Sequence, residues 1–277
     1  MSVRELARRV WNEVRADEVL DRSASLSYYF LFALFPALLF LTTLLGLLPW
    51  RLMDQLMEYV ARVLPGDAAP LVQKTLVEII WGAHPGLLSI GIAAALWTAS
   101  SGMTAIMTAL NIAFDVEDRR AWWRRRLIAL ALTVGFSILI PTALVLLIFG
   151  ERMGQTLADW IGLGWAFRAI WQLLRWSAVL ACVLTLVGLI YSLAPAGRRR
   201  WRWVTPGSIF AVAGWLVLSI ALRLYVANYG NYNKTYGSIA GVILLLSWLY
   251  MTGVVLLVGA EIDSEIAAGQ RETPRRA

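Results

Sequence analysis

One set of polar side chains recurs at helical spacing within an apolar stretch of this 277-residue chain. Residues three or four positions apart share one face of a helix, so these side chains form a stripe. Hydroxyl and amide groups in such a stripe hydrogen-bond either a polar group that passes along it or a neighbouring helix. The sequence leaves both interpretations open for the stripe, which consists of Trp97, Ser101, Thr104, Thr108 and Asn111.

Two later apolar stretches carry similar stripes. One stripe consists of Ser177, Ala181, Thr185, Gly188 and Ser192. The other consists of Ser208, Trp215, Ser219 and Arg223. Three stripes together predict a semi-polar cavity among the first, second, fourth and fifth apolar stretches. The alternative is helix packing alone, because small residues let helices approach closely.

Two charged residues near the ends of apolar stretches are candidate functional residues. Arg223 lies about 27 Å along its stretch at 1.5 Å per residue, so we expect it near the outer interface, where it meets substrate or extends toward the headgroups. Glu261 follows Gly259-Ala260 near the inner headgroups. It either pairs with a cytoplasmic arginine or titrates.

Patterns typical of catalytic and metal sites are missing from the sequence. The single histidine, His84, adjoins Pro85, and the single cysteine, Cys182, lies inside an apolar stretch. There is no phosphate-binding loop, no His-Glu-x-x-His motif and no acidic cluster within the apolar stretches. We therefore predict no catalytic residue, no metal ligand and no cofactor, and we expect that the protein is not an enzyme.

Six apolar stretches of bilayer length must position these residues. The chain is 59% hydrophobic with a mean hydropathy of +0.65, whereas soluble domains are about 45–50% apolar. A helical crossing needs about 20 apolar residues. The predicted fold is all-α and polytopic, with spans at Leu26–Leu48, Pro85–Leu110, Leu127–Phe149, Ile170–Leu193, Val204–Val226 and Tyr236–Ile262.

The distribution of arginine predicts how the chain crosses the membrane. Of the 25 basic residues, 17 lie in the N-terminal segment, in the second-to-third and fourth-to-fifth connections, and in the C-terminal tail. Because cytoplasmic loops retain Lys and Arg, we place both termini in the cytoplasm. The same sorting accounts for the net charge of +7 and predicts anionic lipid headgroups, and no nucleic acid, as partners.

The predicted domains are a cytoplasmic amphipathic segment (1–25), a six-helix membrane domain (26–262) and a cytoplasmic tail (263–277). The first segment carries apolar residues at helical spacing, so it lies in the membrane interface or packs under the bundle. Residues 49–84 predict an amphipathic hairpin on the outer surface, as a lid over a pathway or as a cover for the bundle.

Three local patterns add expectations about packing and charge. Pro36 and Pro141 are expected to interrupt the first and third spans, which frees backbone carbonyls. Gly237 and Gly241 form a GxxxG step that predicts close helix packing. The acidic residues of the second-to-third connection alternate with arginines, and this predicts a solvated ion-pair network of Asp115, Glu117 and Asp118.

Several motifs, each short, together carry a family resemblance. They are Ser27-Tyr28-Tyr29 with Phe35-Pro36, Gly86 to Asn111 with Trp97, Tyr191 with Pro195, Thr205-Pro206-Gly207-Ser208, Leu224-Tyr225, Asn231-Tyr232-Asn233, Thr235-Tyr236-Gly237-Ser238, Trp248-Leu249-Tyr250 and Gly259-Ala260-Glu261. On these residues the whole chain resembles the YihY/BrkB family of bacterial inner-membrane proteins. The resemblance implies six helices, both termini inside and a location in the bacterial cytoplasmic membrane.

The resemblance implies no settled activity. Members have been labelled as a ribonuclease and as a serum-resistance virulence factor, and some look like exporters of lipid or other envelope components. The ribonuclease label fits this sequence poorly, because metal-dependent hydrolysis of RNA needs clustered His and Asp ligands.

Our leading hypothesis is a transporter or flippase-like exporter of an amphipathic, anionic lipid or envelope component. The predicted substrate pathway consists of Tyr28, Trp97, Ser101, Thr104, Thr108, Asn111, Arg223, Asn231, Tyr236 and Glu261. The alternative is a non-transporting scaffold for envelope machinery, and a membrane-embedded hydrolase ranks third. The sequence leaves open the substrate, the energy source and whether the chain forms a homo-oligomer.

Overall fold

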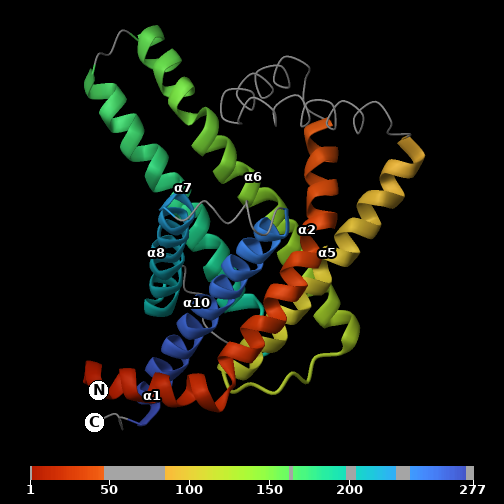
Figure 1. Cartoon of the computed structure of the whole chain (residues 1–277), viewed down its shortest axis with the longest axis vertical. Coiled ribbons are helices and arrows are strands. Elements are labelled where there is room, and N and C mark those ends of the chain that lie inside the picture. The colour runs from red at the N-terminus through yellow and green to blue at the C-terminus, as the bar shows by residue number, and fades with distance from the viewer. Residues whose placement is uncertain (1, 47–84, 162–164, 198–203, 229–237, 273–277) are drawn as a thin grey trace.

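The computed structural model describes residues 2–46, 85–161, 165–197, 204–228 and 238–272 (Figure 1). The predicted outer hairpin at 49–84 and the predicted pathway residues Asn231 and Tyr236 lie outside the described residues. In the described part of the chain, regular structure is entirely helical. Its helices are α1 (Val3–Ala16), α2 (Val19–Gly46), α5 (Pro85–Ala113), α6 (Trp122–Ile161), α7 (Trp165–Leu193), α8 (Pro206–Asn228) and α10 (Ser238–Glu272).

Four of these helices are long and apolar enough to cross a membrane. Their candidate spans are Trp122–Leu147 in α6, Ile170–Leu193 in α7, Pro206–Tyr225 in α8 and Gly241–Gln270 in α10. Helices α2 and α5 coincide with the other two expected spans. The all-helical membrane fold is thus confirmed, while six crossings and the side of each terminus stay predictions.

Neither proline ends its helix, contrary to the sequence expectation. Helix α2 continues through Pro36, and α6 continues through Pro141 for 40 residues in all. Proline removes one backbone donor but leaves the other helical hydrogen bonds in place. In an apolar environment a fully broken helix would leave many more backbone groups unsatisfied, so continuation is favoured.

Local hydrogen bonds explain where two helices begin. Ser2 caps α1 by accepting a bond from the Glu5 backbone N–H at 3.2 Å. At the start of α8, the Ser208 N–H donates to Thr205 Oγ1 (3.1 Å) and the Thr205 N–H donates to Ser208 Oγ (2.8 Å). Pro206 occupies the first helical position, where no N–H is needed. The Thr-Pro-Gly-Ser motif is therefore a reciprocal helix cap.

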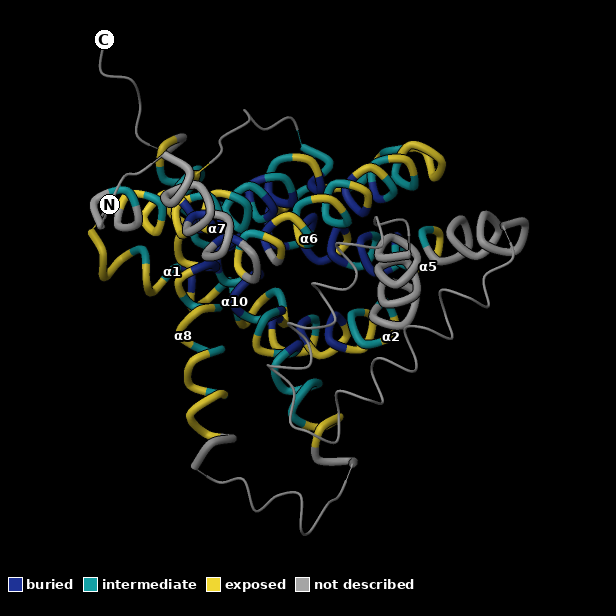
Figure 2. The backbone as a smooth tube through the Cα atoms, turned by 90° about the horizontal axis from the view of Figure 1, so that it is seen from above, coloured by how far each residue is buried: buried dark blue, intermediate teal, exposed yellow. Residues whose placement is uncertain are grey.

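Helix α10 lies at the centre of the bundle, where it packs against α1, α2, α5 and α8. Helix α1 lies across one end of the other helices (Figure 1), and we call this end, with α1 and the last turns of α10, the termini end. Buried residues gather in the middle of the bundle, whereas α8 is largely exposed (Figure 2). The fully buried side chains include Met107, Leu110, Leu132 and Leu257.

Two glycines permit a close crossing of α8 and α10. A Cβ on Gly207 would lie 2.0 Å from the Gly259 carbonyl oxygen, and a Cβ on Gly259 would lie 2.6 Å from the Gly207 oxygen. Gly241 has no such role, because a Cβ there would meet nothing within 4 Å. The expected packing at the GxxxG step is therefore wrong for Gly241, and Gly237 lies outside the described residues.

Candidate functional site

The polar stripe of α5 faces two arginines from the first turns of α6. Arg126 donates from Nη2 to the Trp97 carbonyl oxygen (2.6 Å) and from Nη1 to Ser101 Oγ (3.3 Å). Its guanidinium carbon lies 3.9 Å from the centroid of the Trp97 ring, a cation–π contact. Hydrogen bonding and stacking together fix this guanidinium on the surface of α5.

Arg125 occupies the next step toward the end of α5. Its Nη2 donates to the Thr104 carbonyl oxygen (3.2 Å) and to the Thr108 hydroxyl. Its Nε lies 3.7 Å from Asp118 Oδ2. We call Trp97, Ser101, Thr104, Thr108, Arg125 and Arg126 the arginine ladder. It spans about 16 Å of α5, at 1.5 Å per residue.

The arginine ladder has more positive than negative charge. Among the residues that the structure describes, no carboxylate pairs with Arg126, and the buried Nε atoms of Arg125 and Arg126 have no hydrogen-bond partner. The Trp97 side chain is 50% exposed beside them. A partly buried cation without a counter-ion is costly, so the site favours a ligand that carries negative charge.

Asn111, the last predicted residue of the stripe, is buried and links other segments. Its Nδ2 donates to Asp118 Oδ2 (3.1 Å), and its Oδ1 accepts from the Ala196 N–H (2.7 Å). Arg120 pairs with Asp118 at 2.8 Å and donates to the Ala194 carbonyl oxygen at 2.8 Å. Asn111 therefore positions the connections after α5 and α7, and both polar ends of its side chain are occupied.

The acidic residues after α5 do not form one solvated network. Glu117 and Arg119 form an exposed pair at 2.7 Å, as the sequence predicted. Asp118 instead is 13% exposed, and the hydrogen bonds from Arg120 hold the pKa of its carboxyl below the usual range despite burial. Tertiary contact with the segment after α7 removes Asp118 from water.

Tyr28 and Glu261 contact residues outside the arginine ladder. Tyr28 is 57% exposed on α2, where its ring packs against Phe32 and Tyr29 with centroid distances of 4.6 and 5.8 Å. Glu261 is 2% exposed on α10. Its carboxyl lies within hydrogen-bonding reach of the Asp17 carboxyl, and not beside the cytoplasmic arginine that the sequence offered as one alternative.

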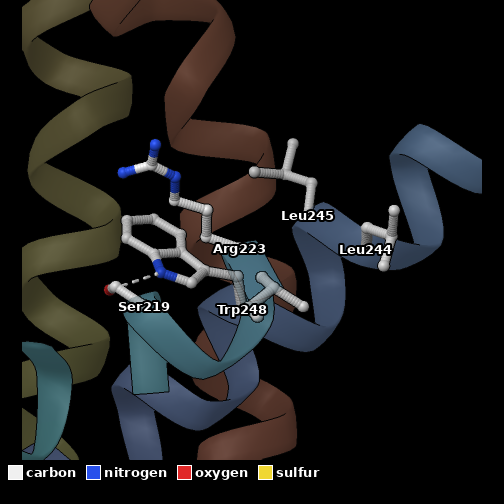
Figure 3. A pocket seen from close by; sticks show the side chains of 6 residues that line it. Ser219, Arg223, Leu244, Leu245 and Trp248 are labelled. Atoms are coloured by element: carbon white, nitrogen blue, oxygen red, sulfur yellow. Dashed lines mark hydrogen bonds between the residues drawn. The ribbon is translucent and has the colours of Figure 1, made fainter. Parts of the chain in front are cut away.

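Arg223 lies at a groove between α8 and α10 (Figure 3). The groove has a volume of about 420 Å³ and is lined by Ser219, Leu222, Arg223, Leu244, Leu245 and Trp248. The indole N–H of Trp248 donates to Ser219 Oγ at 3.1 Å, and the Arg223 guanidinium extends past the indole ring (Figure 3). The third stripe thus faces the sixth predicted span.

Two of the three stripes therefore face helices that the prediction did not include. The α5 stripe faces α6, the third predicted span, and the α8 stripe faces α10, the sixth. Neither partner belongs to the group of spans that was expected to enclose the cavity. Within the described ranges, no three His, Cys, Asp or Glu side chains are arranged to hold a metal ion.

Sequence reasoning missed the two arginines that complete the ladder. Arg125 and Arg126 were assigned, with the other cytoplasmic arginines, to membrane topology and to anionic lipid headgroups, and not to the polar stripe. One feature of the sequence could have indicated their role. The two arginines lie directly before the apolar run of α6, and the preceding helix carries a polar stripe. Asp17, the partner of Glu261, carried no comparable signal in the sequence.

The described part of the chain consists of long apolar helices around a buried centre, and a basic site lies beside a partly exposed tryptophan. These features define an integral membrane protein of the helical class. The chain belongs to a family described as virulence factor BrkB, whose sequence model matches residues 10–277.

The curated relatives include a ribonuclease-like protein and several membrane proteins. The ribonuclease-like protein YfkH of Bacillus subtilis is 37% identical over 244 residues, which cover 88% of each chain. A UPF0761 membrane protein of Stenotrophomonas maltophilia is 26% identical over 94% of this chain and 60% of its own length. One from Xanthomonas oryzae is 24% identical with the same coverage. The chain thus spans about 60% of these UPF0761 relatives. No solved structure matches.

Proposed function

We propose that this protein is a transporter of the flippase type that moves an anionic, amphipathic lipid or envelope component across the bacterial cytoplasmic membrane. The arginine ladder receives the charged headgroup, and the acyl chains stay in the surrounding lipid. The observation that carries the proposal is Arg126, a partly buried guanidinium that has no carboxylate partner among the described residues. The proposal involves no covalent chemistry, in keeping with the expectation that the chain is not an enzyme.

The geometry of the ladder suits a phosphate or carboxylate headgroup. A guanidinium has five N–H donors, and Arg126 directs two donor nitrogens at α5, so other donors remain for a ligand. Side chains beside it are open to the surroundings, with Trp97 50%, Trp123 60% and Leu127 56% exposed. Acyl chains can lie against these apolar surfaces while the headgroup contacts the arginines.

Hydroxyl groups offer the headgroup successive contacts along α5. Ser101, Thr104 and Thr108 lie at steps of about 4.5–6 Å. In the structure the arginines contact two of these hydroxyls directly, those of Ser101 and Thr108. An anion that displaces those contacts exchanges one set of hydrogen bonds for another, so little energy is lost at each step.

The test compares two arginine variants in reconstituted vesicles. Arg126→Gln removes the unpaired charge of the ladder, whereas Arg124→Gln removes an exposed charge two positions earlier on the same helix. The rate at which labelled anionic lipid becomes accessible from the opposite leaflet is measured over a panel of lipids. We expect Arg126→Gln to lower this rate at least about tenfold, because charged hydrogen bonds contribute about 1.5–3 kcal/mol, and Arg124→Gln to change it little.

Two outcomes contradict the proposal. Wild-type protein that accelerates no lipid in the panel over empty vesicles excludes flipping of those lipids. Equal rates for the two variants exclude the arginine ladder as the headgroup site. A scaffold, the alternative function, predicts that both arginine variants and Leu substitutions at Ser101, Thr104 and Thr108 leave function intact.

A further inference from the structure

Two carboxyl groups from distant parts of the chain meet at the termini end. Asp17 follows the last residue of α1, and Glu261 lies on α10. Their carboxyl groups lie within hydrogen-bonding reach of each other. Glu261 is 2% exposed, and its second oxygen, Oε1, is buried without a hydrogen-bond partner. A carboxylate only accepts hydrogen bonds, so a hydrogen bond between the two groups needs a proton on one of them.

The surroundings of the pair are predominantly acidic. Arg22 on α2 is the nearby cation, but its Nε donates to the backbone oxygen of Asp17 (2.6 Å). Arg9 on α1 pairs with Glu5 at 3.4 Å and lies 3.9 Å from Glu265. Glu13 on α1 and Asp115 in the turn after α5 act electrostatically on the pair. Farther out, Glu265 acts on Glu13, and Asp263 acts on Tyr191 of α7.

This environment disfavours two negative charges. Burial, followed by the charge of Asp115, raises the pKa of Asp17 above its usual 3.8. Burial and the neighbouring acids raise the pKa of Glu13 in the same way. Both effects favour proton retention, because a desolvated carboxylate near other carboxylates is unstable.

The backbone is strained on both sides of this junction. Glu18 has a φ of 52° and Asp115 has a φ of 51°, and no other non-glycine residue in the described part of the chain has a positive φ. Such conformations are unfavourable for residues with a side chain and persist where surrounding structure demands them. Glu18 turns the chain from α1 into α2, next to Asp17, and Asp115 directs the end of α5 toward the pair.

We propose that Asp17 and Glu261 form a proton-binding site that holds α1 against α10. With the proton bound, one carboxyl donates to the other and α1 is docked. When the proton leaves to the solvent at the termini end, two carboxylates remain in contact and repel each other, and α1 separates from α10. This inference concerns a site away from the arginine ladder and does not depend on the proposed lipid substrate.

Infrared spectroscopy of the full chain in lipid nanodiscs tests proton binding directly. A protonated carboxyl has its own carbonyl-stretching band, whose loss is followed as pH rises. We expect wild-type protein to retain such a band above the usual titration range of exposed carboxyls. Glu261→Gln and Asp17→Asn should each abolish this late-titrating band. The control Asp21→Asn, an exposed acid on the first turn of α2, should leave it unchanged.

A distance measurement tests the movement of α1. Labels are placed at Arg8→Cys and Gln270→Cys, both exposed positions on α1 and α10, in a Cys182→Ser background that removes the single native thiol. The distance should increase as pH rises, and Glu261→Gln, which is neutral at every pH, should keep it short. The proposal is wrong if neither variant removes the late-titrating band, or if the label distance is independent of pH.

Discussion

At the scale of single residues, burial separates groups that look alike in the sequence. Asp118 and Glu117 are adjacent acids in one arginine-rich connection, yet Asp118 is 13% exposed and Glu117 is 74% exposed. Asp118 receives hydrogen bonds from Arg120 and Asn111, which also hold the segment after α7. One carboxylate is therefore part of the framework, and its neighbour is a surface ion pair.

Replacement of these two acids measures that difference. Asp118→Asn should lower the free energy of unfolding by about 2 kcal/mol at neutral pH, because it removes charged hydrogen bonds in a site with little water. Glu117→Gln should change it by less than about 0.5 kcal/mol. Chemical denaturation in detergent measures both values, and equal effects would contradict the structural role of Asp118.

The pH dependence of the same variant has a defined sign. The pKa of Asp118 is lowered in the folded protein from its usual 3.8. The contribution of the Asp118 carboxylate to the free energy of unfolding is therefore present above pH 3.8, and it is lost as pH falls through the lowered folded-state pKa. The stabilities of wild-type protein and Asp118→Asn should converge in that acidic range, and a constant difference at all pH values would oppose this assignment.

At the scale of helices, one crossing joins motifs that are far apart in the sequence. Gly207 of the Thr-Pro-Gly-Ser cap touches Gly259 of α10, and its N–H donates to Asp263 Oδ1 at 2.8 Å. Tyr191 of α7 donates its hydroxyl to the Leu256 carbonyl oxygen nearby. Much of the family resemblance rests on these residues. The motifs therefore reflect how α7, α8 and α10 pack together at the termini end.

Two glycine variants on α10 test the crossing. A Cβ at position 259 would lie 2.5 Å from the Tyr191 hydroxyl, so Gly259→Ala should destabilise the protein by about 3 kcal/mol through overpacking. Gly241→Ala adds the same methyl group in open space and should be neutral or stabilise the helix by up to about 1 kcal/mol. Thermal unfolding of the two variants in one detergent gives the comparison, and a neutral Gly259→Ala would contradict the close approach.

At the scale of the whole molecule, α1 and the end of α10 share one side of the bundle. Helix α1 packs against α10 and α2, and Val10 of α1 is buried with 8% exposure. Trp11 beside it is 56% exposed. The amphipathic segment thus packs under the bundle through one face, while its other face stays available to the membrane interface.

This arrangement predicts the topology of both ends. Reporters fused to the N-terminus and the C-terminus should both be active in the cytoplasm, because α1 holds the two ends together and the arginine distribution retains them inside. A reporter pair that differs in activity between compartments provides the measurement. Reporters active on opposite sides would overturn the predicted even number of crossings.

The sequence alone determined that the chain forms long apolar helices, four of which are long and apolar enough to cross a membrane. Apolar runs of bilayer length have few alternatives, since a backbone in hydrocarbon must satisfy its own hydrogen bonds. The predicted span Ile170–Leu193 agrees with the candidate span in α7 residue for residue. The polar stripe on α5 was also readable, because helical spacing fixes which side chains share a face.

Only the tertiary structure decided what each stripe and charge contacts. Arg125 and Arg126 contact the α5 stripe, and Asp17 contacts Glu261, because separate helices pack against each other. Helical periodicity shows which side chains share a face, but it does not show which helix that face will contact. The sequence did not indicate the central position of α10 either, because the packing of α10 against its neighbours depends on close fit at glycines such as Gly259. Hydrophobicity determines which helices can enter the membrane, whereas side-chain packing between helices determines which residues come together in the site.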